Sequence, residues 1–131
     1  MTGSTKVFIS HTQDDVRFAR ELSKALVARG IDATGAWGLA PGKSIEEQLQ
    51  QALGAATMYV VLLSDRTLLS PWVYFEVGAA IGGRKRLVLV YLSERARLEV
   101  PAPLRRSLTI EATSLRPEEV ADRVVEAAKA A

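Results

Sequence analysis

The sequence predicts an α/β fold in which helices cover both faces of a parallel β-sheet. Segments with strand-like and helix-like patterns alternate along the chain. Two strand-like segments, Thr57–Ser64 and Arg86–Ser93, are almost continuously apolar, which is typical of strands buried on both faces of a parallel sheet. Such alternation favours a sheet between two layers of helices. At 131 residues, we expect a single domain over residues 1–131.

The first strand and helix have clear boundaries in the sequence. Lys6–Ser10 is a short β-branched and aromatic run, as expected of a buried strand. Thr12 and Asp15 have the spacing of a capping box, which predicts a helix that begins near Gln13 and ends at Gly30. Its apolar positions recur at helical spacing: Val16, Ala19, Leu22, Leu26 and Val27.

A second, weaker strand is expected over Ile31–Trp37, before a loop rich in glycine and proline at residues 38–43. Ser44 then precedes the segment "IEEQLQQAL", whose acidic residues stand in the first turn, where the helix dipole favours them. This segment is predicted to be the second helix.

The rest of the chain continues the alternation. Ser70, followed by a proline, is expected to start a third helix over Trp72–Ile81. Residues 94–106 fit neither pattern. Ser107–Ala112 is expected to form a short fifth strand, and the last fifteen residues, "PEEVADRVVEAAKAA", an amphipathic helix.

Composition narrows the function classes. No apolar run approaches the ~18 residues of a membrane-spanning helix, and the first residues lack the layout of a signal peptide, so we expect a soluble, cytoplasmic protein. The chain has no cysteine and a single histidine, His11, which argues against disulfides, metal sites and Ser-His-Asp chemistry. Basic residues are scattered and the net charge is +2, so no nucleic-acid partner is expected.

Candidate site residues follow the predicted strands. The carboxyl ends of parallel strands meet at one edge of a sheet, where ligands bind. Ser10 and His11 stand at the end of the first strand, Trp37 ends the second, and Ser64 ends the third. We therefore expect these residues to converge at that edge.

Three stretches resemble the Toll/interleukin-1 receptor (TIR) domain family in its bacterial form: "VFISHTQDD", "WGLAPGKSI" and "VVLLSDRTLLSPWVYFEVGAAIG". The last contains the pattern S-x-W-x-x-x-E, which ends at Glu76. The likeness covers nearly the whole chain and implies a three-layer, flavodoxin-like sandwich with a five-stranded parallel sheet. The sequence departs from the family where many relatives carry an acid, since Gly35 and Ala36 stand there, and His11-Thr12-Gln13 replaces residues that are often basic.

The resemblance implies an activity. The glutamate that matches Glu76 is the catalytic residue of family members that act as NAD⁺ glycohydrolases, with NAD⁺ as substrate and no cofactor. Some members release ADP-ribose, some form cyclic products, and others only assemble with partner TIR domains. Prokaryotic members often serve in antiphage defence, and self-association is the expected activating event.

The chemistry is consistent with one carboxylate. Cleavage of the bond between nicotinamide and ribose passes through an oxocarbenium-like state, which a carboxylate stabilises, and nicotinamide leaves as a neutral molecule without a general acid. Trp72 and Glu76 stand four residues apart, on one face of the predicted helix. The alternative is a solvated surface glutamate, or one paired with Arg84 or Lys85.

The other candidate residues each have two interpretations. Trp37 either stacks on a nicotinamide or adenine ring or anchors its loop on the core. Trp72 contacts the ligand or belongs to the core. Ser10 and His11 contact ribose or nicotinamide, or His11 is only a turn residue. Lys43 pairs with a phosphate or is solvated.

Three other functions stay open. The first is a non-catalytic TIR scaffold or adaptor. The second is a phosphoacceptor receiver domain, because Asp14 and Asp15 follow the first strand and Asp65 follows the third. The third is a nucleoside deoxyribosyltransferase, which has a similar sheet and a glutamate near the same edge.

Overall fold

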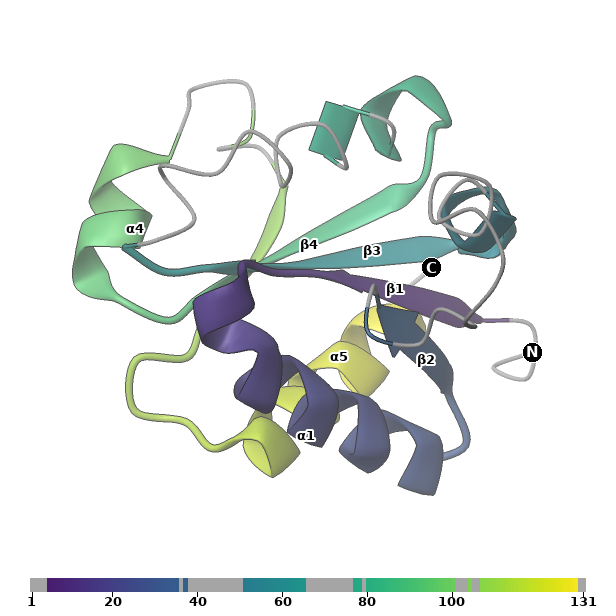
Figure 1. The fold of residues 1–131 in the computed structure, drawn as a ribbon, viewed down its shortest axis with the longest axis horizontal. Coiled ribbons are helices and arrows are strands. Elements are labelled where there is room, and N and C mark those ends of the chain that lie inside the picture. The colour runs from purple at the N-terminus through teal and green to yellow at the C-terminus, as the bar shows by residue number, and fades with distance from the viewer. Residues whose placement is uncertain are drawn as a thin grey trace.

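A computed structural model describes residues 5–35, 37, 51–65, 77–78, 80–100, 104 and 107–129. It contains a five-stranded, all-parallel sheet with strand order β2-β1-β3-β4-β5 (Figure 1). This order is that of flavodoxin-like folds, and the predicted fold class is confirmed. The strands are β1 Lys6–Ser10, β2 Asp32–Gly35, β3 Met58–Leu63, β4 Arg86–Tyr91 and β5 Leu108–Glu111.

The helices lie in two layers. Helices α1 (Val16–Ala28) and α5 (Pro117–Lys129) pack against each other on one face of the sheet (Figure 1). On the other face, residues 51–55 and the described parts of 77–82 are helical. The predicted starts of these last two helices, near residues 44 and 72, lie outside the described residues.

A short helix, α4 (Glu94–Glu99), lies within residues 94–106, which fitted neither the strand nor the helix pattern. Ser93 caps it, since the Ser93 hydroxyl accepts a hydrogen bond from the Ala96 backbone N–H at 3.1 Å. Among the described residues, no helix is long and apolar enough to cross a membrane.

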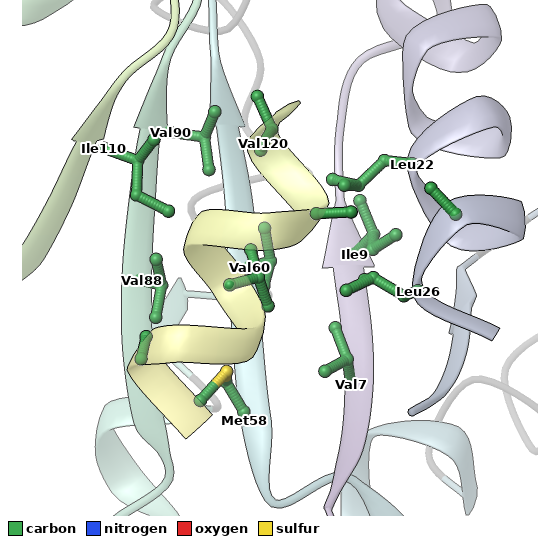
Figure 2. Close-up of a cluster of buried hydrophobic side chains, with 14 of the residues drawn as sticks. Val7, Ile9, Leu22, Leu26, Met58, Val60, Val88, Val90, Ile110 and Val120 are labelled. Carbon is green, nitrogen blue, oxygen red and sulfur yellow. The ribbon is translucent and has the colours of Figure 1, made fainter. Parts of the chain in front are cut away.

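The residues of β1 alternate between the two faces of the sheet. Val7 and Ile9 belong to the core beneath α1 and α5, where Leu22 and Leu26 meet them (Figure 2). Phe8 belongs to the opposite core, with its ring 5.8 Å from that of Tyr59. Because successive strand side chains point to opposite faces, the side chain of Ser10, the last residue of β1, points to the same face as Phe8.

Helix α1 ends in a Schellman motif at Gly30. The Gly30 N–H donates to the Val27 carbonyl oxygen and the Ile31 N–H to the Leu26 carbonyl oxygen, both at 3.0 Å. Gly30 has φ of +84°, a left-handed conformation that glycine adopts without steric cost. The predicted helix end is therefore confirmed, and it directs the chain into β2.

Candidate functional site

Two buried polar atoms at the carboxyl edge of the sheet have no hydrogen-bond partner. Ser10 is fully buried, and neither its Oγ nor the buried Nε2 of His11 has a partner within the described part of the chain. Buried polar groups are nearly always paired, and an unpaired one costs about 1–3 kcal/mol. A polar group of a ligand would therefore stabilise each of these two atoms.

The unpaired His11 nitrogen has a defined chemical character. The other ring nitrogen, Nδ1, lies 2.7 Å from the Thr12 carbonyl oxygen. A carbonyl oxygen can only accept, so Nδ1 is the donor in this contact, and in the tautomer with this single ring proton Nε2 is an acceptor. The side chain of His11 is consequently set to accept a hydrogen bond from an N–H or O–H group.

Trp37 lies against His11. Their ring centroids are 5.3 Å apart at an interplanar angle of 43°, and Trp37 is partly buried against the core beneath α1 and α5. Its indole fills the space next to Gly35, where an added Cβ would lie only 2.2 Å from the indole Cζ3. Trp37 thus packs on the core while part of its surface stays exposed, and its indole leaves no room for a side chain at position 35.

The described candidate residues lie at the carboxyl edge of the sheet, but on different faces of it. His11 and Trp37 are together on the α1 side. Ser10 continues the alternation of β1, pairs in register with Val61, and faces the same side as Val77. The structure brings His11 and Trp37 into contact and places the Ser10 side chain across the sheet from them.

The predicted capping box at Thr12 and Asp15 is not formed. The Asp15 backbone N–H donates to the Thr12 carbonyl oxygen at 3.1 Å in the 3₁₀ turn η2 (Gln13–Asp15), so it is not free for the hydroxyl. Instead, the Thr12 hydroxyl and the Ser64 hydroxyl both donate to Asp15 Oδ2, at 3.0 and 2.6 Å. This carboxylate ties the turn after β1 to the end of β3.

A similar contact follows the neighbouring strands. The Ser93 hydroxyl donates to Asp65 Oδ1 at 2.7 Å, joining the segments after β3 and β4. Sequence reasoning missed the two serine–carboxylate pairs that join the ends of neighbouring strands, Ser64–Asp15 and Ser93–Asp65. The signal was that a serine ends or closely follows each of the three central strands, at positions 10, 64 and 93.

Asp15 and Asp65 thus each accept a hydrogen bond from a different serine hydroxyl. Within the described residues, no group of three His, Asp or Glu side chains is placed to hold a metal ion. Glu76, Trp72 and Lys43 lie outside the described residues, so their roles stay predictions.

Comparison with known proteins decides the family. The family model for the TIR domain matches residues 7–125. The chain belongs to the TIR domain family. No protein of curated function shows significant sequence similarity to it.

Solved structures agree with this assignment. The TIR domain of a Toll-related receptor from Hydra magnipapillata matches with a TM-score of 0.73 and 17% identity, covering 94% of this chain and 97% of the other. The TIR domains of the activated Roq1 resistosome, which recognises the pathogen effector XopQ, match with a TM-score of 0.60 and 25% identity over 94% and 71%. A CMP N-glycosidase from Clostridium botulinum matches with a TM-score of 0.62 and 16% identity over 94% and 99%. The likenesses below 25% identity concern the fold alone.

Proposed function

We propose that this TIR domain is an NAD⁺ glycohydrolase. The observation that carries the proposal is the pair of unpaired buried atoms, Ser10 Oγ and His11 Nε2, at the sheet edge where α/β folds bind ligands. Membership of the TIR family supports the choice of substrate. In the reaction, the bond between ribose C1′ and the nicotinamide nitrogen breaks and its electron pair stays on nicotinamide. Water then adds to C1′ and releases a proton, giving ADP-ribose.

Each candidate residue has a role in this proposal. The Glu76 carboxylate stabilises the positive charge that develops on the ribose. His11 Nε2 accepts a hydrogen bond from the nicotinamide carboxamide or from a ribose hydroxyl, and the Ser10 hydroxyl donates to or accepts from the ribose. Trp37 offers an aromatic face to a ring of the substrate, and we expect Lys43 and Trp72 to complete the site on the phosphate and nicotinamide sides.

The proposal includes activation by self-association, with a cyclic form of ADP-ribose as an alternative product and a role in bacterial antiphage defence. Assembly completes the site in this view, because the loop that follows Trp37 would be held against a neighbouring copy. The runner-up is a TIR scaffold without catalytic activity, which would use the same assembly to recruit partners.

Turnover of NAD⁺ by the wild type and by Glu76→Gln tests the enzyme against the scaffold. We expect the substitution to lower turnover at least about 100-fold, while Glu126→Gln, an exposed glutamate on α5, leaves it unchanged. Chromatography of the products separates ADP-ribose from cyclic forms, and CMP and deoxynucleosides serve as competing substrates. Absence of turnover under every assembling condition would leave the scaffold.

A second variant tests the observation itself. His11→Phe keeps a ring beside Trp37 but removes the acceptor nitrogen, so we expect the Michaelis constant for NAD⁺ to rise about tenfold with little loss of stability. Unchanged kinetics in this variant would show that His11 Nε2 does not meet the substrate.

A further inference from the structure

An open depression of about 390 Å³ lies on the α1 side of the carboxyl edge, between the start of α1 and the turn that leads into α5. Phe18, Leu92 and Leu115, all partly buried against the core, form its apolar floor. Its other lining residues include Asp14 and Glu21. With Asp15, the lining has three carboxylates and a single guanidinium, that of Arg17, which lies 3.7 Å from Glu21. Two negative charges are left in excess, so a cationic group with an apolar neighbour would be complementary to the lining.

Such a pair of groups stands at the opposite end of the sheet. The turn at residues 83–85 directly precedes β4, at the amino edge (Figure 1). The Arg84 side chain is exposed and forms no hydrogen bond or ion pair with a described residue, whereas the Lys85 ammonium donates to the Gly54 carbonyl oxygen at 3.0 Å. Ile81, in the last helical turn before Arg84, is 56% exposed.

The backbone at Arg84 is strained. The Arg84 N–H donates to the Ile81 carbonyl oxygen at 3.2 Å and the Lys85 N–H to the Ala80 carbonyl oxygen at 2.9 Å, which is the same Schellman motif that ends α1 at Gly30. Here, however, the left-handed position, φ +55°, holds an arginine. A side chain in this conformation is less stable than glycine would be, so the turn carries a basic side chain at a cost in stability.

We propose that the 83–85 turn of one copy docks in the depression of a second copy. The Arg84 guanidinium faces the Asp14 and Glu21 carboxylates, and Ile81 packs on the apolar floor. Because the two surfaces lie at opposite ends of the same sheet, the contact is head-to-tail and repeats from copy to copy, as in an open filament. This contact involves neither Glu76 nor the loop that follows Trp37. Only a link between association and NAD⁺ turnover would rest on the proposed function.

Charge reversal at the two surfaces tests the contact. Sedimentation velocity over a concentration series should show concentration-dependent association of the wild type, and Arg84→Glu and Glu21→Arg should each weaken it at least about tenfold, because each places like charges together. The double variant Arg84→Glu/Glu21→Arg should associate again. Arg123→Glu, an exposed reversal on α5, is the matched control and should behave as the wild type.

The outcomes separate this inference from the enzyme proposal. A wild type that stays monomeric at all concentrations, a single variant that associates normally, or a double variant that fails to recover overturns the docking contact. Circular dichroism of each variant establishes that the fold is kept. NAD⁺ turnover is measured in the same samples. If association follows the charges but no sample consumes NAD⁺, the enzyme proposal fails and the contact stands. If the wild type consumes NAD⁺ while the variants associate normally, only the contact fails.

Discussion

Gly35→Ala tests the packing of Trp37 most directly. The added Cβ would lie 2.2 Å from Cζ3, 2.7 Å from Cη2 and 2.8 Å from Cε3 of the indole. Because carbon atoms in contact stand about 3.5–4.0 Å apart, the ring has to move by roughly 1 Å or more, away from its position beside His11. Gly35 has an ordinary φ, so the effect of the methyl group is steric.

The magnitude follows from overpacking. Inserting a methyl group into a filled site typically costs about 1–3 kcal/mol, and we expect the free energy of unfolding to fall by about that amount. Gly54→Ala is the matched control, because its Cβ meets nothing within 4 Å and it lies in a helical segment. There, alanine should raise stability by about 0.5–1 kcal/mol.

Urea unfolding followed by circular dichroism measures both variants, and Trp37 fluorescence in a Trp72→Phe background reports the position of the ring. The clash should vanish when the indole is absent, so Gly35→Ala should cost little in a Trp37→Leu background. If the full cost persists there, or if the single variant is as stable as the wild type with unchanged emission, the steric argument is wrong.

Two further predictions concern stability. Arg84→Gly should raise the free energy of unfolding by about 0.5–1 kcal/mol, whereas Gly30→Ala should lower it by about 1 kcal/mol, since both positions are left-handed; thermal melts of the two variants should shift in opposite directions. The backbone N–H of Arg116 donates to Glu119 Oε1 at 3.1 Å and holds the pKa of Glu119 below its ordinary value of 4.5. Its stabilisation is therefore fully present above about pH 4.5 and is lost as the pH falls through the lowered pKa, so Glu119→Gln should be less stable than the wild type at neutral pH and converge with it in acid. A difference that stays constant with pH would contradict this.

The sequence was sufficient for elements with a strong periodic pattern. All five predicted strands are present in the same order along the chain, although β2 is shorter than expected. Helix α4 was missed because only Ala96 among its six residues is buried, so its pattern carries no helical stripe, and its support comes from the Ser93 cap and an exposed Arg95–Glu99 pair at 3.0 Å.

For the candidate residues that the structure describes, the sequence predicts their place along the strands and not the contacts that they make. The strand pattern predicts the placement of Ser10 at the end of β1 and of His11 directly after it. The contact between Ser64 and Asp15 joins residues 49 positions apart and depends on the register of β1 with β3, which no local pattern encodes. The packing of the Trp37 indole against Gly35 likewise depends on the path of the chain after β2, which no local pattern encodes.

The two outermost strands restrict how copies of this domain can join. The sheet described here is bounded by β2 and β5, each four residues long, and each carries an exposed carboxylate, Asp32 or Glu111. Short, charged borders of this kind discourage a neighbouring chain from extending the hydrogen-bonded ladder sideways. Growth of an assembly is thereby directed along the strand axis, where each added copy keeps its own sheet complete.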